Sequence, residues 1–265
     1  MDDGYKNGII TDERLEEALT RILGTKAALG LHKKAKTEIL PEKEVAMAKI
    51  GLEENKAIAK EVSDKAITLV KNTQDVLPIA PEKTKRVLLV EAKGFDGGFG
   101  KFIEIMGGAK KKPVEIVKEL LEAKGFEVEI WESPIDKIMK LPKEEMAQAL
   151  GNVYAGKRPI AELTSKYDLI INIANVNASV DQRLQWPPSK GTPDIPFYVN
   201  EIPTIFISVK CPFHLADVPQ VKTYINTYDD NQQTLEALVE KLVGNTKFKG
   251  ISPVDAFCGF GDTRF

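Results

Sequence analysis

The chain has 265 residues, of which 43% are hydrophobic and 29% charged, and this composition excludes a disordered chain, a collagen-like repeat and a disulfide-rich scaffold. Its 37 basic and 39 acidic residues give a formal net charge of −2. That balance lacks the electrostatic signature of a protein that binds nucleic acid or an anionic membrane. At roughly 100–200 residues per domain, the length allows one large domain or two smaller ones.

Cysteine and histidine are too sparse to suggest a metal site. The cysteines are Cys211 and Cys258, the histidines are His32 and His214, and no C-x-x-C pair or His/Cys cluster occurs. We therefore expect no structural zinc and no cofactor. One disulfide is possible, although both thiols are interpreted as small buried hydrophobic groups.

No stretch of 18 apolar residues occurs, so no membrane-spanning helix is expected. The segment Met1–Lys6 is too polar for a signal peptide. The sequence leaves the localisation open between cytoplasmic and exported.

A helix is predicted from Thr11, a favourable N-cap followed by two acidic residues. Apolar residues recur at helical spacing from Leu15 to Leu23, and the pattern fades at Gly30. A polar connector then leads to Pro41. A second helix is predicted from about Pro41 to Ala66, with Gly51 as a point of interruption because glycine is a poor residue in a helix interior.

The remaining sequence alternates between short β-rich runs and helical stretches. The predicted strands are Ile67–Val70, Val87–Val90, Phe126–Trp131, Leu169–Ile173 and Ile205–Val209. The predicted helices are Val114–Lys124, Lys143–Leu150 and Gln232–Val243. Several of the strands are continuously apolar, which is typical of strands buried on both faces. The pattern predicts an α/β layer fold with a mostly parallel sheet.

The glycine-rich loop Gly94–Gly100 follows a predicted strand, where a phosphate-binding loop would lie. A dinucleotide-binding fingerprint fails because its third glycine would fall at Ile103, and a P-loop fails because Phe102 replaces the hydroxyl residue. We interpret the segment as a loop at a strand end. The alternative is a loop over a ligand, since ligands bind at that edge of α/β sheets.

His214 is the better catalytic candidate of the two histidines because it follows the end of a predicted strand. The alternative is a loop histidine with a structural hydrogen bond. His32 ends the first helix, where it complements the helix carbonyls. No G-x-S-x-G nucleophile elbow occurs.

The stretch Asp181–Gly191 combines charged residues, amides and a tryptophan before a proline-rich exit. A tryptophan face suits the apolar face of a sugar ring, and Arg and Gln suit its hydroxyls. The alternative is a structured loop with a packed tryptophan. The substrate-contact candidates are Asp181, Gln182, Arg183, Trp186 and His214.

Three separated parts of the chain together resemble family-3 glycoside hydrolases. The first part, Gly8–Leu31, resembles the segment that closes the catalytic barrel of that family. The second, from Ala59 through Ala66–Asn72 to Leu77–Ile79, resembles the opening of its C-terminal domain. The third resembles the later strands and the exit, and it comprises Phe206–Val209, Pro212–Leu215, Thr223–Tyr228 and Gly250–Asp255. Within the third part, the exit segment and the strand Tyr224–Tyr228 are most similar to the β-N-acetylglucosaminidase branch.

This resemblance implies a three-layer α/β sandwich domain preceded by a linker helix. It divides the chain into 1–40, a linker helix and connector from the end of a barrel, and 41–265, the sandwich domain. Family members carry their nucleophilic aspartate on an N-terminal (β/α)8 barrel, for which this chain has no room. The acid/base lies on the barrel in the β-N-acetylglucosaminidase branch and on the sandwich domain in many β-glucosidases.

Three functional hypotheses remain from the sequence. The first is an accessory domain of a retaining glycosidase that cleaves terminal β-linked N-acetylglucosamine or glucose, inactive alone because hydrolysis needs two carboxyl groups about 5–5.5 Å apart. This first hypothesis predicts an exposed apolar stripe on the first helix. The second is a stand-alone carbohydrate- or small-ligand-binding module with its site at Trp186. The third is an independent enzyme with a site around His214.

Overall fold

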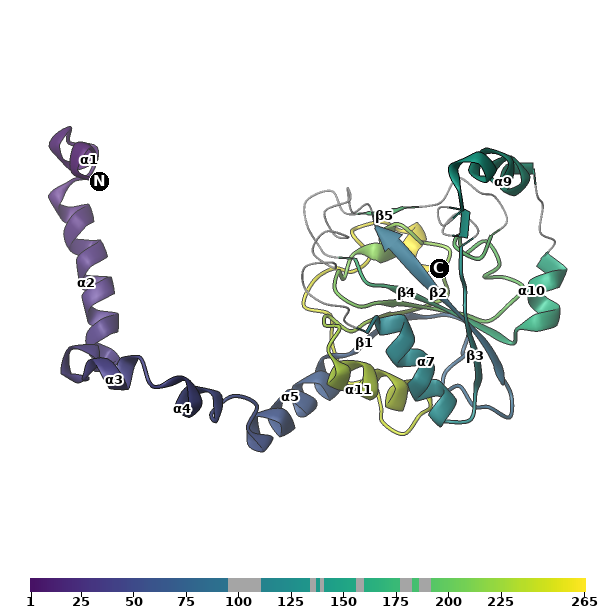
Figure 1. The fold of residues 1–265 in the computed structure, drawn as a ribbon, viewed down its shortest axis with the longest axis horizontal. Helices are drawn as coiled ribbons and strands as arrows, with labels where there is room; N and C mark the ends of the chain where they lie inside the picture. The colour runs from purple at the N-terminus through teal and green to yellow at the C-terminus, as the bar shows by residue number, and fades with distance from the viewer. Residues whose placement is uncertain (95–110, 134–136, 139–140, 156–159, 177–182, 186–191) are drawn as a thin grey trace. The chain divides into compact units, whose positions relative to one another are not determined.

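The computed structural model describes residues 1–94, 111–133, 137–138, 141–155, 160–176, 183–185 and 192–265. The chain divides into two compact units, Met1–Lys56 and Ala57–Phe265. Figure 1 shows the first as a series of helices and the second as a sheet with helices. Among the described residues, no helix has both the length and the apolar character needed to cross a membrane.

The first unit is helical. Its elements are α1 (Asp2–Lys6), α2 (Asp12–Ala28), the 3-10 helix η1 (Leu31–Lys33), α3 (Lys36–Ile39) and α4 (Lys43–Met47). The Thr11 hydroxyl accepts a hydrogen bond from the backbone N–H of Arg14 at 3.3 Å, as expected of an N-cap. Gly30 lies between α2 and η1 with a φ of 66°, a conformation that glycine adopts without steric cost. The predicted first helix is confirmed.

The predicted second helix is two helices, α4 and α5 (Glu53–Ala66). Between them Gly51 has a φ of 71°, which places it in the left-handed region and breaks the helical path. The sequence had marked this glycine as the point of interruption. The boundary of the two compact units falls inside α5, between Lys56 and Ala57.

The second unit is built on one sheet with the strand order β1-β7-β6-β4-β2-β3, and β5 pairs with β2 outside this path. The strands are β1 (Thr68–Asn72), β2 (Arg86–Gly94), β3 (Glu127–Ile130), β4 (Leu169–Ala174), β5 (Leu184–Gln185), β6 (Thr204–Ser208) and β7 (Thr223–Asn226). The β1–β7 and β2–β5 pairs are antiparallel, and the other pairs are parallel. The predicted α/β fold with a mostly parallel sheet is confirmed.

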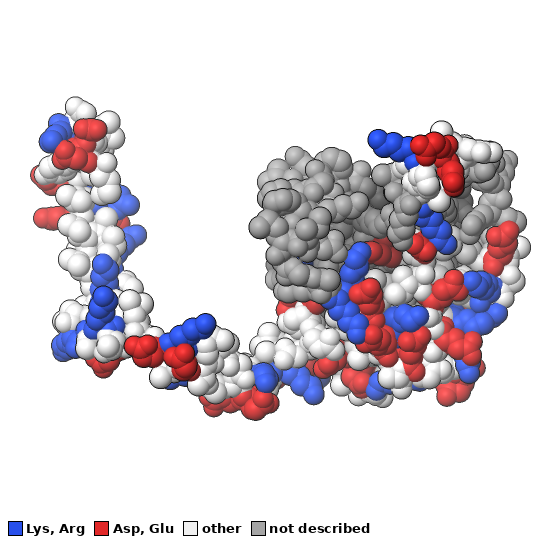
Figure 2. Space-filling model, viewed as in Figure 1, with Lys and Arg blue, Asp and Glu red and all other residues white. Residues whose placement is uncertain are grey.

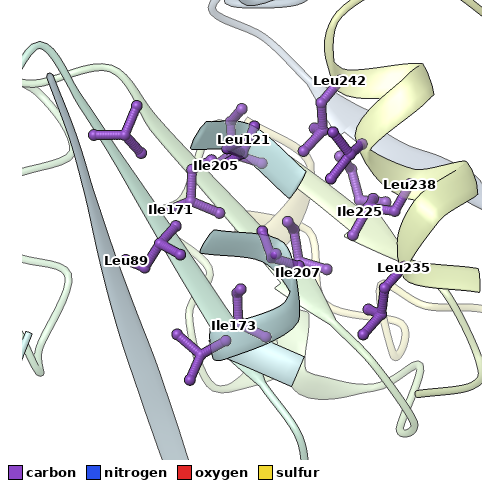
Figure 3. Close-up of a cluster of buried hydrophobic side chains, with 14 of the residues drawn as sticks. Leu89, Leu121, Ile171, Ile173, Ile205, Ile207, Ile225, Leu235, Leu238 and Leu242 are labelled. Carbon is purple, nitrogen blue, oxygen red and sulfur yellow. The ribbon is translucent and has the colours of Figure 1, made fainter. Parts of the chain in front are cut away.

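Helices cover both faces of this sheet, which makes three layers. On one face α7 (Pro113–Ala123) and α11 (Gln232–Leu242) pack side by side. Their apolar side chains meet Leu89, Ile171 and Ile207 of the central strands in the main core, shown in Figure 3. On the other face Leu163 of α10 (Ile160–Lys166) packs with Leu88. The remaining elements are α9 (Lys143–Ala155) and the 3-10 helices η2 (His214–Ala216) and η3 (Asp262–Arg264).

The continuous apolar runs of the sequence explain why the central strands lie in the middle. Every residue of β4 and of β6 is buried, as expected for parallel strands covered on both faces. Each fully buried Ile or Leu contributes about 1.5–3 kcal/mol through the hydrophobic effect. The central strands thereby hold a rigid edge at their carboxyl ends, from which the loops emerge.

Candidate site at the carboxyl edge of the sheet

Polar side chains gather where β6 ends and η2 begins. Because β2, β4 and β6 are parallel, their carboxyl ends lie at the same edge of the sheet, the edge at which α/β folds bind ligands. Ser208 is the last residue of β6, and the chain turns there through Cys211 into η2, which starts at His214. The sequence places His214 here correctly, six residues after Ser208.

A short hydrogen-bond chain links Ser208, Cys211 and His214. The Ser208 hydroxyl donates its proton to the backbone carbonyl of Cys211, and its oxygen lies 2.9 Å from Nδ1 of His214. Since a hydroxyl has a single proton to donate, Nδ1 of His214 must be the protonated nitrogen and the donor to Ser208. The other ring nitrogen, Nε2, is then the acceptor form. It is buried and finds no hydrogen-bond partner among the described residues.

His214 is neutral in this arrangement. Its side chain lies in the interior, with 1% of the residue exposed. Burial lowers the pKa of His214 below its ordinary value of 6.5, and the carboxylate of Asp217 opposes this shift with a smaller effect. A buried neutral imidazole that holds a loop by one hydrogen bond is suited to positioning that loop.

Arg183 is the exposed residue of the site, and it is paired with the largely buried Asp217. Nε of Arg183 donates to Oδ1 of Asp217 at 2.6 Å, and the backbone N–H of Leu184 reaches Oδ2 at 3.3 Å. The Arg183 side chain is 65% exposed, whereas that of Asp217 is 10% exposed. The carboxylate therefore ties the start of β5 to the end of η2, while much of the Arg183 guanidinium remains accessible to solvent.

The strand β5 also brings together the two loops that the sequence marked as candidates. Gly94, the last residue of β2, pairs with Leu184, which follows Arg183 directly. The glycine-rich segment and the Asp181–Gly191 segment are thus joined at this point of the edge. Of the predicted contacts, Asp181, Gln182 and Trp186 lie outside the described residues, as does the loop from Phe95 to Gly100.

Asp217 and Ser208 are site residues that sequence reasoning missed. Their only local signal is position, because Ser208 closes an apolar strand and Asp217 follows η2. Both cysteines are free thiols. Burial raises the pKa of Cys211, which keeps it protonated, and burial also raises the pKa of Cys258. Among the described residues, no group of three His, Cys, Asp or Glu side chains is arranged to hold a metal ion.

The buried imidazole predicts a pH dependence of stability. Because the folded-state pKa of His214 is below 6.5, the unfolded chain binds the extra proton as the pH falls through that value and the folded chain resists it. Stability is therefore complete above about pH 6.5 and decreases below it, by up to about 1.4 kcal/mol per pH unit. His214→Asn, which keeps a donor near Ser208 but cannot titrate, is expected to flatten this slope.

Urea unfolding at pH 7, 6 and 5 measures the effect. The matched control is His32→Asn, because His32 is exposed and is the other histidine of the chain. The control is expected to keep the slope of the wild type. If His214→Asn keeps that slope as well, the assignment of a buried neutral imidazole is wrong.

Comparisons with known proteins show which proteins this chain is similar to. No family model matches the chain. A curated protein of Cellulomonas fimi, described as a β-N-acetylglucosaminidase/β-glucosidase, is 36% identical over 268 aligned residues, which cover 100% of this chain and 43% of that protein. A solved β-glucoside phosphorylase is 36% identical with a TM-score of 0.70, covering 99% of this chain and 42% of that one.

The chain is homologous to the C-terminal domain of family-3 glycoside hydrolases. A family-3 β-N-acetylglucosaminidase from a Paenibacillus species shares the fold, with a TM-score of 0.51 at 19% identity over 94% of this chain and 40% of that one. The chain therefore spans 42–43% of the length of the two more similar relatives. These relatives carry an N-terminal domain that has no counterpart in the 265 residues. The recognition of the family from the sequence is confirmed.

Proposed function

We propose that this domain is the accessory C-terminal part of a retaining glycosidase that cleaves terminal β-linked N-acetylglucosamine or glucose, and that it is inactive alone. The observation that carries the proposal is the extent of the match, which takes in the whole of this chain but 43% of a β-N-acetylglucosaminidase/β-glucosidase. Retaining hydrolysis requires two carboxyl groups about 5–5.5 Å apart on either side of the bond. In this proposal the N-terminal domain carries at least one of them.

The N-terminal partner is proposed to be a (β/α)8 barrel, with residues 1–40 as its closing helix and connector and 41–265 as the sandwich domain. Support comes from α2, none of whose residues is buried. Leu19, Ile22 and Leu23 are 46%, 52% and 58% exposed and share one face of the helix. An apolar stripe of this kind is typical of a surface that another domain covers.

The carboxyl edge is proposed to contact the sugar. Arg183 is the described residue best placed for this role, because its guanidinium is exposed and offers several donors beyond the bond to Asp217. Asp181, Gln182 and Trp186 remain proposed contacts. For His214 the proposal is a role at this edge through the loop after β6, since the ring itself is buried.

A second reaction is favoured by one observation. The solved relative that is 36% identical to this chain is described as a β-glucoside phosphorylase, an enzyme whose acceptor is phosphate in place of water. The parent protein is therefore a candidate for phosphorolysis as well as hydrolysis. Turnover with and without inorganic phosphate distinguishes the two, because only phosphorolysis yields a sugar phosphate.

A chimera tests the accessory role. The part of the Cellulomonas fimi relative that precedes its match to this chain is joined ahead of Met1, and release of aryl alcohol from aryl β-N-acetylglucosaminide and aryl β-glucoside is measured. The chimera is expected to turn over at least one of them, with the isolated chain as reference. Ile22→Asp is expected to lower the rate at least tenfold, because it places a charge on the apolar stripe.

The matched control is Thr20→Asp, on the polar side of α2 about 160° from Ile22, which is expected to leave the rate unchanged. A folded chimera without turnover would contradict the accessory role. Equal rates for the two α2 variants would contradict the docking of the N-terminal domain on this stripe. The alternative to the accessory role is a stand-alone sugar-binding module. That alternative predicts that Trp186→Ala abolishes sugar binding.

A further inference from the structure

A cleft of about 220 Å³ lies between the end of the edge strand β3 and the helix α10. Its wall on the strand side is formed by Glu129 and by Trp131, which directly follows the strand. Leu163 and Lys166 of α10 and the adjoining Tyr167 form the helix side. None of the lining residues belongs to the candidate site described above, which is formed by Arg183, Ser208, Cys211, His214 and Asp217. The volume is below the roughly 300–1,000 Å³ of pockets for drug-sized ligands, so it suits a single small ring.

The lining of the cleft contains two lysines and two glutamates, so its formal charge is zero. Lys166 donates to Glu129 at 2.7 Å, and Lys137 lies 3.7 Å from Glu132 at the rim. The Lys166 ammonium lowers the pKa of Glu129, so both members of this pair are charged at neutral pH. The remaining charged residue of the lining is Glu162. Figure 2 shows charges of both signs interspersed over the described face of this unit. Such a lining favours a neutral ligand with many hydroxyls, which bond to carboxylate acceptors and ammonium donors.

The aromatic wall is fixed in place. Nε1 of Trp131 donates a hydrogen bond to Oδ2 of Asp194 at 3.0 Å, and the backbone N–H of Trp131 continues the pairing with Leu89 of β2. Trp131 is partly exposed. A pre-oriented indole costs little entropy on binding and offers an apolar surface beside polar groups. An apolar ring face next to hydroxyl partners matches the two sides of a pyranose.

We propose that this cleft binds one neutral saccharide ring, held against Trp131 and hydrogen-bonded by the Glu129–Lys166 pair. The choice of N-acetylglucosamine and glucose as ligands rests on the proposed function. The site would hold part of a saccharide away from the bond being cleaved, as a second contact between the domain and its substrate.

The two tryptophans of the chain allow a direct test, since Trp131 and Trp186 are its only indoles. In Trp186→Phe all tryptophan fluorescence comes from Trp131, and in Trp131→Phe all of it comes from Trp186. N-acetylglucosamine, glucose and cellobiose are titrated into each variant, and the open-chain polyol mannitol serves as the ligand control. Trp186→Phe is expected to show a saturable change with the ring sugars that mannitol does not reproduce.

The proposal also predicts that removing the Glu129–Lys166 ion pair weakens sugar binding. In the Trp186→Phe background, Lys166→Ala is expected to raise Kd about tenfold, the loss typical of one hydrogen bond to a charged group. Lys65→Ala is the control, because it removes a comparable exposed pair with Glu61 on α5, a helix that does not line the cleft, and its Kd should not change.

No saturable change in Trp186→Phe up to 100 mM sugar would overturn the proposal. A change seen only in Trp131→Phe would overturn it as well and would place the binding at Trp186. The result is independent of the chimera experiment, because sugar binding at Trp131 does not require turnover. Binding at Trp131 together with an inactive chimera would mean that the cleft is real and the accessory role is wrong.

Discussion

Gly250→Ala is expected to lower the free energy of unfolding by about 3 kcal/mol. An added Cβ at Gly250 would overlap the carbonyl oxygen of Ala66 and lie 2.6 Å from both the carbonyl oxygen of Ile67 and Oγ1 of Thr68. Two of these atoms belong to the backbone where α5 passes into β1, and the Ile67 side chain is fully buried there. The backbone cannot move away without disturbing the core. The loss of stability therefore lies at the upper end of the usual range for overpacking.

Urea unfolding followed by circular dichroism measures this loss. Gly261→Ala is the matched control, because Gly261 lies in the same C-terminal segment, has a φ of −68°, and has open space where the Cβ would be. The control is expected to change stability by less than about 0.5 kcal/mol. If the two variants unfold at the same urea concentration, the C-terminal segment does not pack against the α5–β1 junction as described.

Asp64→Asn is expected to cost about 3 kcal/mol by leaving a buried ammonium without a counter-ion. The Lys241 side chain is 0% exposed and donates to Oδ1 of Asp64 at 2.6 Å and to the carbonyl oxygen of Lys247 at 2.9 Å. Removing one member of a buried pair costs about 3–5 kcal/mol, and we take the lower end because Asp64 is 31% exposed. The Asp64–Lys241 pair links α5 to the end of α11.

A double-mutant cycle tests this account. Adding Lys241→Met to Asp64→Asn is expected to recover part of the loss, since the unpaired charge disappears. The control is Glu61→Gln, which breaks the exposed Glu61–Lys65 pair of the same helix and should cost less than about 1 kcal/mol. A loss for Asp64→Asn no larger than for Glu61→Gln would show that the ammonium is not confined as the structure describes.

The same pair has a pH signature. The hydrogen bond from Lys241 lowers the pKa of Asp64 below its ordinary value of 3.8. The stabilisation is therefore complete above that value and is lost as the pH falls below it. This window lies below that of His214, so the two contributions separate in a titration of stability.

Elements with a strong local pattern were predictable from the sequence. The apolar runs gave β4 and β6, and Gly125, with a φ of 93°, ends α7 as a helix-terminating glycine should. By contrast, β5 has two residues and no periodicity, and it exists because Leu184 pairs with Gly94. Pairing of that kind is a tertiary effect that no local pattern encodes.

The site at His214 and the cleft at Trp131 also differ in how far the sequence predicts them. The sequence indicates His214 through its position after a strand, but its burial and its bond to Ser208 depend on how η2 folds back onto β6. The cleft at Trp131 was missed, although the alternating run that contains it was recognised. Glu129 and Trp131 meet Lys166 only when α10 packs beside the edge strand.

Turnover by the isolated chain tests the central claim most directly. The purified 265-residue chain is incubated with aryl β-N-acetylglucosaminide and with aryl β-glucoside, in each case with and without inorganic phosphate, and aryl alcohol is measured against a blank without protein. An accessory domain that depends on a separate N-terminal domain for its catalytic carboxylates predicts no release above the blank in all four reactions. Release that co-purifies with the chain through a further chromatographic step would contradict the account, because a complete active site would then lie within these residues.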